Sequence, residues 1–370
     1  MAYNADYERA EPRQSLGRGW IGWVILAIVA VVITALAFAP SNFVIERPGP
    51  VFDTLGTISA DGDTVPLVDI PMQETFPTTG SLDMLTVTTV GNRESRVSWL
   101  EILKAWLDQS EAVIDVDSAF PDGETGEQSA EVGQAQMVQS QQEAIAAALS
   151  ATGYHYTTAI TVAATTKGGP SDGLILAKDV VTAVNGTPVD DPDQLRALLE
   201  TNGTEAPATI SVLRDAAPLD VQVTPVLSTA ETPSPIIGIQ ITTAYTFPFE
   251  VTIQAGDIGG PSAGQMFALA IIDKLTPGSL NGGAAVAGTG TITESGVIGP
   301  IGGIRQKLYG AQRAGADYFL APASNCDEVV GHIPAGLSVF AVSTLADSVS
   351  VLTTISTGAS TALLPRCTVG

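Results

Sequence analysis

The chain has 370 residues, enough for two or three domains with their own cores, and a formal net charge of −23, from 16 Lys and Arg against 39 Asp and Glu. This acidic balance argues against nucleic-acid binding, because phosphate binding needs a basic surface. The two cysteines, Cys326 and Cys367, are too few for a disulfide framework and lack metal-ligand spacing, so no metal site and no cofactor is predicted. Outside the cytoplasm these two cysteines could pair with each other.

An uncharged apolar block runs from Trp20 to Ala39. It is long enough to cross a bilayer, which needs ~20 apolar residues in a helix. Three arginines precede the block, so the positive-inside rule places the N-terminus in the cytoplasm and everything after Pro40 on the outer side of the cell membrane. A cleaved signal peptide ending at Ala39 is the alternative, but the block exceeds the ~7–15 apolar residues of such signals. We therefore expect a cytoplasmic tail over 1–19 and a single transmembrane anchor over 20–40.

Residues 41–128 are predicted to form a β-rich, membrane-proximal segment with one helix. Two runs rich in β-branched residues, bounded by Gly and Pro, indicate strands at 64–70 and 82–90. Apolar residues recur on one face of a helix between Glu94 and Leu107. The tryptophans of this helix, Trp99 and Trp106, are expected in the core; the alternative is contact with the bilayer interface.

Residues 129–228 are predicted to contain a helix followed by a small β-rich unit. An exposed acidic loop is expected at 117–133, and a helix rich in Gln and Ala at 135–150. The elements predicted after it are a strand at 159–164, a turn at 168–173, the stretch 174–189, a helix at 192–199 and two more strands at 209–213 and 219–223.

Over residues 150–227 this order resembles a PDZ domain of the bacterial protease type. Domains of that type capture an extended peptide as an added strand at a sheet edge. Two features depart from the pattern: Lys178 stands where a Gly usually precedes the aspartate, and no Gly-hydrophobic-Gly loop occurs near residues 153–156. Peptide binding therefore competes with a role as a spacer that shapes an oligomer or gates a site.

The residues that indicate chemistry lie between Gly256 and Pro322. Ser262 lies in the turn Gly-Gly-Pro-Ser-Ala-Gly just before an apolar helical run, and Thr289 lies in the sequence Gly-Thr-Gly-Thr. Lys307 begins a second helical pattern after Gly-Pro-Ile-Gly-Gly-Ile-Arg-Gln. These blocks, in this order, resemble the proteolytic domain of the Lon-type serine–lysine peptidases over roughly residues 236 to 345.

The resemblance implies roles for these three residues. Ser262 would be the nucleophile, Lys307 the general base and Thr289 a support for the lysine. A serine hydroxyl is a weak nucleophile without a base, and a free lysine, with a pKa of about 10.4, would need desolvation toward roughly 7–8 to serve as one. Backbone groups at Gly260, Pro261 and Ala263 are the expected oxyanion-hole region.

One feature departs from the Lon pattern: Gly259 occupies the position that is acidic in cytosolic Lon enzymes. Regulation through an acidic residue at that position is therefore not expected here.

Two other readings compete. Gly260-Pro-Ser-Ala-Gly264 also fits the G-x-S-x-G elbow of esterases, with His332 as base, but an elbow needs a strand running straight into the serine. A catalytically silent PDZ adaptor or oligomeric scaffold is the second reading.

Overall we predict an α+β protein with an N-terminal transmembrane helix, the β-rich segment, the PDZ-like unit, a linker at 229–235, a Lon-type proteolytic domain at 236–357 and a loose tail at 358–370. The whole resembles the membrane-anchored PDZ–Lon proteins of bacteria. No G-x-x-x-x-G-K-[ST] loop occurs, so we expect cleavage of unfolded or extended polypeptides without ATP or another nucleotide partner. The expected partners are polypeptide substrates, the membrane and further copies of the chain as a homo-oligomer, and not nucleic acid.

Overall fold

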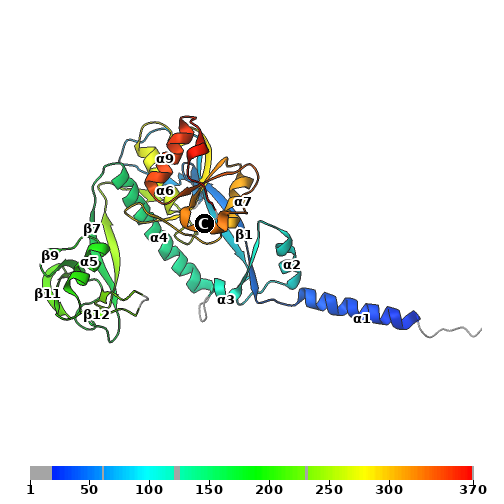
Figure 1. The fold of residues 1–370 in the computed structure, drawn as a ribbon, viewed down its shortest axis with the longest axis horizontal. Coiled ribbons are helices and arrows are strands. Elements are labelled where there is room, and N and C mark those ends of the chain that lie inside the picture. The colour runs from blue at the N-terminus through cyan, green and yellow to red at the C-terminus, as the bar shows by residue number, and fades with distance from the viewer. Residues whose placement is uncertain (1–18, 61, 121–125, 230–231, 369–370) are drawn as a thin grey trace, which may run out of the picture. The chain divides into compact units, whose positions relative to one another are not determined.

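The computed structural model describes residues 19–60, 62–120, 126–229 and 232–368 (Figure 1). Most of the predicted cytoplasmic tail therefore lies outside the described residues. The chain divides into two compact units, one of Met1–Gly49 with Val87–Ser129 and one of Pro50–Thr86 with Ala130–Gly370. This division differs from the predicted one, because residues 50–86 group with the C-terminal part of the chain and not with the membrane-proximal segment.

The smaller unit begins with α1 (Gly19–Phe38), a helix long and apolar enough to cross a membrane and exposed along its length. The first residues of β1 (Phe43–Asp53) pair antiparallel with β6 (Ala112–Asp115), which leads into α3 (Val116–Ala119). A small core of Ile45, Val97, Ile102 and Ala105 holds α2 (Trp99–Leu107) in this unit.

The structure corrects two predictions here. The helix expected from residue 94 begins at Trp99, because Ser98 and Glu101 form a capping box at its N-terminus. The expectation that Trp99 and Trp106 are core residues is wrong: they are 41% and 61% exposed, and Ile102 and Ala105 occupy the buried face instead.

In the larger unit, a largely parallel sheet carries the predicted proteolytic region. The strands neighbour one another in the order β20-β19-β16-β5-β1, and β5–β16, β16–β19 and β19–β20 are parallel pairs. The bounds are β5 (Ser81–Val90), β16 (Ala285–Gly288), β19 (Tyr318–Pro322) and β20 (Ser338–Val342). Four two-stranded pairs accompany the larger sheets of this unit: β2 (Thr57–Ala60) with β3 (Asp63–Pro66), β4 (Val68–Asp69) with β15 (Thr252–Ile253), β12 (Val226–Leu227) with β13 (Pro235–Ile236), and β17 (Thr291–Ile292) with β18 (Ile298–Gly299).

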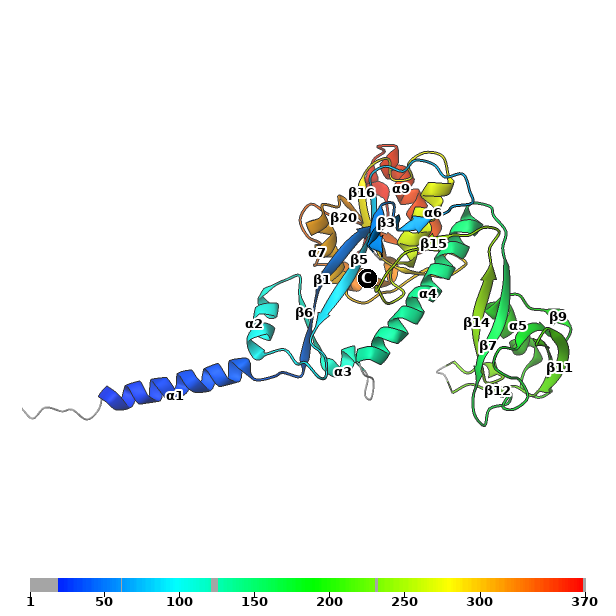
Figure 2. The same ribbon diagram turned by 180° about the vertical axis from the view of Figure 1, so that it is seen from behind.

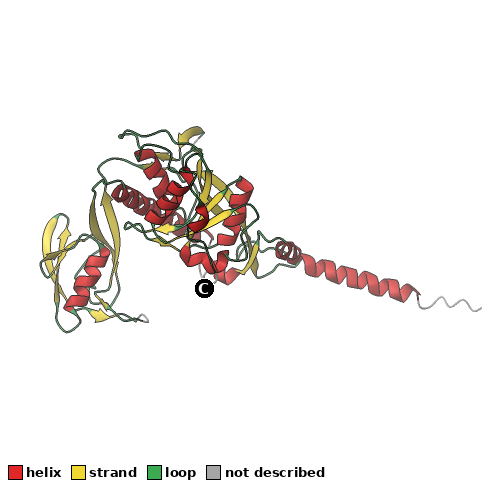
Figure 3. Cartoon of the chain, turned by 45° about the horizontal axis from the view of Figure 1, so that its top comes forward, coloured by secondary structure: helices red, strands yellow, loops and turns green. Residues whose placement is uncertain are grey.

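Helices cover both faces of this sheet, and successive strand residues alternate between them. Val286 and Leu320 pack in the core that holds α4 (Gly126–Ala151), α6 (Gly264–Leu275) and α9 (Leu345–Ser356). Their neighbours Ala287 and Phe319 pack in a second core with α7 (Ile304–Ala314) and α8 (Cys326–Val329). This is the period-two alternation of a strand buried on both sides. Figure 3 shows the resulting mixture of helices and strands, so the α+β prediction is confirmed.

The PDZ-like unit is an antiparallel sheet, in the order β11-β10-β8-β7-β14, with α5 (Pro192–Asn202) packed on it. The strands are β7 (Thr157–Thr165), β8 (Val180–Val184) with its partner β9 (Thr187–Pro188), β10 (Ala208–Arg214), β11 (Ala217–Val223) and β14 (Ile239–Thr246). β14 pairs with β7 along its whole length, although the sequence assigned residues from 236 onward to the proteolytic domain. Lys178 has φ +76°, which explains why a glycine suits that position.

Two predicted loops are ordered. The acidic stretch 117–133 includes part of α3 and the start of α4, apart from residues 121–125, which are not described. The predicted loose tail is held in place as far as it is described: Cys367 forms a disulfide with Cys326, and Ala341 N–H donates to the Pro365 carbonyl at 3.0 Å. Single 3₁₀ turns lie shortly before each cysteine: η1 (Ala323–Asn325) directly before Cys326 and η2 (Thr361–Leu363) before Cys367.

Candidate active site

The turn that carries Ser262 lies between β15 and α6, so the serine directly precedes a buried helix. Its side chain is partly exposed, whereas the next residues of the chain are buried. Position 264 requires a glycine because neighbouring side chains lie very close to its backbone. A Cβ there would lie 2.7 Å from both the Ser140 hydroxyl and the Ile292 side chain. Gly260 adopts φ +87°, a conformation that L-residues rarely take. The glycines of this motif therefore shape a tight turn that presents the hydroxyl of Ser262.

Thr289, which follows β16, fixes the backbone of the serine. The Thr289 hydroxyl donates to the Ser262 carbonyl at 2.9 Å, and Gly290 N–H donates to the same carbonyl at 2.9 Å. Gln265 N–H in turn donates to the Gly290 carbonyl at 3.1 Å. Thr289 is fully buried, so its hydroxyl makes hydrogen bonds inside the site and none with solvent.

Lys307 reaches the serine from α7. This helix begins at Ile304 after Gly303, which has φ +67°, so Lys307 lies in its first turn rather than at its start. Lys307 is 3% exposed, and Ile304 and Leu308 beside it are fully buried. Its Nζ atom lies 2.7 Å from Ser262 Oγ and 2.9 Å from Thr289 Oγ1. The three residues selected from the sequence are therefore brought into one hydrogen-bonded group.

Sequence reasoning missed Asn325, which holds the loop before α7. Its side chain is 3% exposed and pairs with both backbone groups of one residue: Ile301 N–H donates to Oδ1 at 2.9 Å, and Nδ2 donates to the Ile301 carbonyl at 2.8 Å. The adjacent Cys326 carries the disulfide to Cys367. Nothing in the local sequence pattern marks this asparagine.

The helix predicted at 135–150 is part of α4, but the sequence did not indicate that α4 contacts the serine turn from a distant part of the chain. The Ser140 hydroxyl donates to the Pro261 carbonyl at 2.9 Å, and Gly260 N–H donates to the Gly133 carbonyl at 2.8 Å. Met137, Ala144 and Leu149 place the same helix in the core shared with α6. A small-residue face of α4 thus lies directly against the turn.

These contacts correct the predicted oxyanion region. Pro261 has no N–H group, and Gly260 donates its N–H to Gly133. Of the three residues proposed from the sequence, Ala263, the residue before α6, is the candidate donor in this conformation.

The structure does not show the strand and the serine–histidine contact that the esterase alternative needs. β15 ends at Ile253, so no strand runs straight into Ser262. The Nδ1 atom of His332 is buried without a hydrogen-bond partner among the described residues. Lysine, and not histidine, is the basic side chain hydrogen-bonded to the serine.

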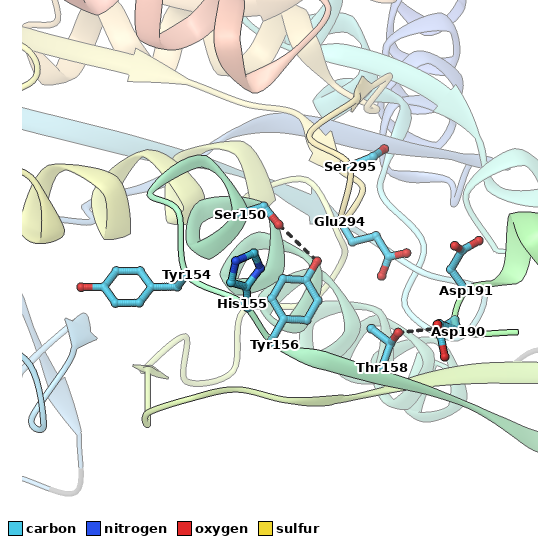
Figure 4. A pocket seen from close by; sticks show the side chains of 9 residues that line it. All are labelled: Ser150, Tyr154, His155, Tyr156, Thr158, Asp190, Asp191, Glu294 and Ser295. Carbon is cyan, nitrogen blue, oxygen red and sulfur yellow. Dashed lines mark hydrogen bonds between the residues drawn. The ribbon is translucent and has the colours of Figure 1, made fainter. Parts of the chain in front are cut away.

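A cavity of about 390 Å³ lies away from these residues, where the start of β7 approaches the turn between β17 and β18 (Figure 4). His155 and Tyr156 lie side by side in it, with Glu294 facing them. Tyr245 O–H donates to Glu294 at 2.6 Å, and burial, followed by this bond, raises the pKa of Tyr245. Ser262, Thr289 and Lys307 are not among its lining residues. No group of three or more His, Cys, Asp or Glu side chains in the described ranges is placed to hold a metal ion.

One stretch of the chain is similar to a known protein domain. Residues 243–354 match the Lon protease (S16) C-terminal proteolytic domain. Lon protease 1 of Sorangium cellulosum is 36% identical over 94 residues, which cover 25% of this chain and 11% of that protein. The Lon protease of Helicobacter pylori strain J99 is 31% identical over 142 residues, which cover 37% of this chain and 17% of that protein. The chain thus spans less than a fifth of the length of these relatives.

Two solved structures are similar to part of the chain. The PDZ domains of SdrC-like proteins from Listeria monocytogenes and Listeria innocua each align with 22% of this chain, at 13% and 15% identity and TM-scores of 0.21 and 0.20, and the alignments cover 85% and 92% of those chains. The domain match and the Lon relatives fit a Lon-type proteolytic domain, and the N-terminal apolar helix is compatible with a single-pass membrane anchor. The predicted resemblance is confirmed at this level, and the match supports a serine peptidase domain.

Proposed function

We propose that this protein is a serine endopeptidase in which Ser262 is the nucleophile, Lys307 the general base and Thr289 the residue that orients the lysine. The observation that carries the proposal is the 2.7 Å separation between Lys307 Nζ and Ser262 Oγ in a site where the lysine is almost fully buried. A nucleophile and base within hydrogen-bond reach, with the base oriented by a third group, is the arrangement that activates serine.

The contacts suggest how the lysine is oriented. The Thr289 hydroxyl gives its hydrogen to the Ser262 carbonyl, so it can only accept a hydrogen from Lys307. One N–H of a neutral amine then points at Thr289, and the lone pair can face the serine hydroxyl. Burial disfavours the charged ammonium, which favours the neutral form that a base requires.

In the proposed reaction the Ser262 oxygen attacks the peptide carbonyl while its proton moves to Lys307. The protonated lysine then gives that proton to the leaving amine, and an acyl-enzyme remains. Water, deprotonated by the neutral lysine, releases the acyl group and restores the serine. The N–H of Ala263, the residue before α6, is the proposed donor to the developing oxyanion.

The same proposal places the bulk of the chain on the outer side of the cell membrane, anchored by α1 with its N-terminus in the cytoplasm. Two observations support this. α1 is long and apolar enough to cross a membrane. The disulfide between Cys326 and Cys367 is of the kind that persists in oxidising compartments.

Substrates are proposed to be unfolded or extended polypeptides, cut without ATP, since the 370 residues contain no nucleotide-binding P-loop motif. The PDZ-like unit is proposed to recruit or gate them; β14 is at the end of its sheet, where an added strand can pair. A homo-oligomer is proposed as the working form.

The test is proteolysis of an unfolded, fluorescently labelled protein by the full-length chain in detergent, without nucleotide. Wild type and His332→Ala should cleave it, whereas Ser262→Ala and Lys307→Arg should not, because arginine stays protonated. The rate of the wild type should rise with pH as Lys307 loses its proton. Cleavage by Lys307→Arg would remove the lysine from the mechanism. Absence of cleavage by a folded wild type would favour the catalytically silent scaffold.

A further inference from the structure

We propose that the exposed face of α2 is a lipid-docking surface that lies in the interface of the membrane crossed by α1. The docking face consists of Trp99, Leu103, Trp106 and Leu107. This inference rests on the proposed membrane anchor, and the experiment below separates failure of one from failure of the other.

The first step is the exposure of the docking face. Its four side chains are 41%, 53%, 61% and 82% exposed in chain order. Their spacing of three and four residues places them on one side of a helix. Large apolar side chains gathered on one surface indicate a partner, whereas single exposed ones do not.

The second step is that the docking face is fixed. The opposite side of α2 carries Ile102 and Ala105, which are 0% and 1% exposed and pack with Ile45 and Val97. The capping box between Ser98 and Glu101 sets the first turn of the helix. A rotation of α2 that buried the docking face would break the contacts of Ile102 and Ala105 with this core.

The third step is continuity with α1, which belongs to the same compact unit. Trp99 N–H donates to the Ala39 carbonyl at 3.3 Å, and Ser41 N–H donates to the Val97 carbonyl at 2.9 Å. The Trp99 ring packs edge-on against Phe43 at 5.8 Å. Figures 1 and 2 both show α2 beside the C-terminal end of α1. A span that ends at Phe38 therefore holds the docking face where the chain leaves the membrane.

The fourth step is the chemistry of the partner. Tryptophan favours the membrane–water interface, where the ring contacts acyl chains and the indole N–H contacts polar groups. Lys104 is exposed on the same helix, and an interfacial lysine can extend toward headgroups. The net charge of −23 opposes attraction to anionic lipid, so the apolar side chains must supply most of the binding. Docking should therefore change little with salt.

The experiment uses the four tryptophans of the chain, Trp20 and Trp23 in α1 and Trp99 and Trp106 in α2. The full-length double variant Trp20→Phe/Trp23→Phe reports on α2, and Trp99→Phe/Trp106→Phe reports on α1. Each is reconstituted into phosphatidylcholine vesicles with or without bromine on the acyl carbons nearest the headgroup. Bromine should quench the α2 tryptophans by a factor of about two or more, and equally at low and high salt.

A matched pair of variants controls for general effects. Leu103→Glu/Leu107→Glu, in the background that reports on α2, should reduce the quenching. Leu174→Glu/Leu176→Glu, which alters two leucines of the PDZ-like unit that are 46% and 45% exposed, should leave it unchanged. Circular-dichroism melts establish that both variants are folded.

The outcomes separate the two proposals. If bromine quenches the α1 tryptophans but not the α2 tryptophans, the docking surface is ruled out and the membrane anchor is still supported. Neither helix quenched would overturn both, whereas quenching of α2 alone would support docking and overturn the span. The fluorescence of the α2 tryptophans could instead be the same with and without bromine and indicate a buried environment only at high protein density. A second copy of the chain would then cover the docking face, and the inference would be wrong.

Discussion

The hydroxyl of Ser140 donates a hydrogen bond of 2.9 Å to the carbonyl of Pro261, the residue before the proposed nucleophile. The two residues lie 121 positions apart, so α4 acts on the serine turn from a distant part of the chain. Gly133, two helical turns earlier on α4, accepts from Gly260 N–H in the same turn. We infer that α4 positions the nucleophile, and this inference can be tested without touching the dyad.

Ser140→Ala should lower activity while the protein stays folded. One hydrogen bond contributes about 0.5–1.5 kcal/mol, which corresponds to a roughly 2- to 13-fold loss of kcat if the bond only orients Ser262. Ser150→Ala is the matched control on the same helix, because the Ser150 hydroxyl donates to the Tyr156 hydroxyl at 3.4 Å and not to the serine turn. The test compares the peptidase rate and the thermal melt of both variants with those of wild type. Equal activity of Ser140→Ala and wild type would show that α4 does not position the turn.

The proposed dyad and its threonine could be selected from the sequence because each lies in a short glycine-bearing block that resembles the Lon pattern. The contacts from α4 could not, because helical periodicity says which face is apolar but not which distant turn it meets. Asn325 shows the same limit: its double contact with Ile301 depends on how two loops meet across the fold.

Thr289→Val should remove the orienting hydroxyl while nearly preserving side-chain shape. Because Thr289 is fully buried between Lys307 and the Ser262 carbonyl, we expect a loss of about 10- to 100-fold in kcat with little change in KM. Thr289→Ser keeps the hydroxyl and should retain most of the activity. Steady-state kinetics on one peptide substrate distinguish the two variants. Similar losses in both would mean that packing, and not the hydroxyl, matters at this position.

Removing the disulfide should loosen the C-terminal part of the proteolytic core. Cys326 and Cys367 are 41 residues apart, and a loop of that length is worth about 3–4 kcal/mol in the chain-entropy account of disulfides. Cys326 also follows Asn325, which holds the loop before α7. Cys326→Ser/Cys367→Ser should therefore melt at lower temperature and lose part of its activity. Wild type treated with a reductant should behave like the double variant, and an unchanged melt in both would contradict the prediction.

The fold class could be predicted from the order of strand and helix patterns. Which side of α2 is buried could not be predicted in this way. Its apolar residues were predicted to face a core, whereas Ile102 and Ala105 alone are buried within the helix. Periodicity finds an apolar stripe but does not say whether protein or lipid covers it. The boundary at residue 236 stays a prediction, since β14 pairs with β7 in the structure while the Lon-domain match begins at residue 243, within β14.

The last prediction concerns Asp83 in β5, whose side chain is 7% exposed and faces the core that contains Leu85 and Ala287. The pKa of Asp83 is raised from 3.8 to about 6: burial raises it most, a hydrogen bond from Ser81 at 3.1 Å partly offsets this, and the nearby Asp53 adds to the rise.

The sign follows from proton linkage. The folded protein holds this proton more tightly than the unfolded chain, so the contribution of Asp83 to the free energy of unfolding falls as the pH rises from about 4 to about 6 and stays low above that. The loss should be about 2 kcal/mol once solvent screening is allowed for.

Asp83→Asn removes the ionisation and leaves an oxygen that can accept from Ser81. It should therefore be more stable than wild type at pH 7.5 and show a smaller gain at pH 4.5. Urea unfolding of the full-length chain at both pH values gives the two differences, and Asp69→Asn, an exposed aspartate of β4, controls for the loss of one negative charge. If Asp83→Asn is less stable than wild type at pH 7.5, the ionised carboxylate stabilises the fold and the predicted direction is wrong.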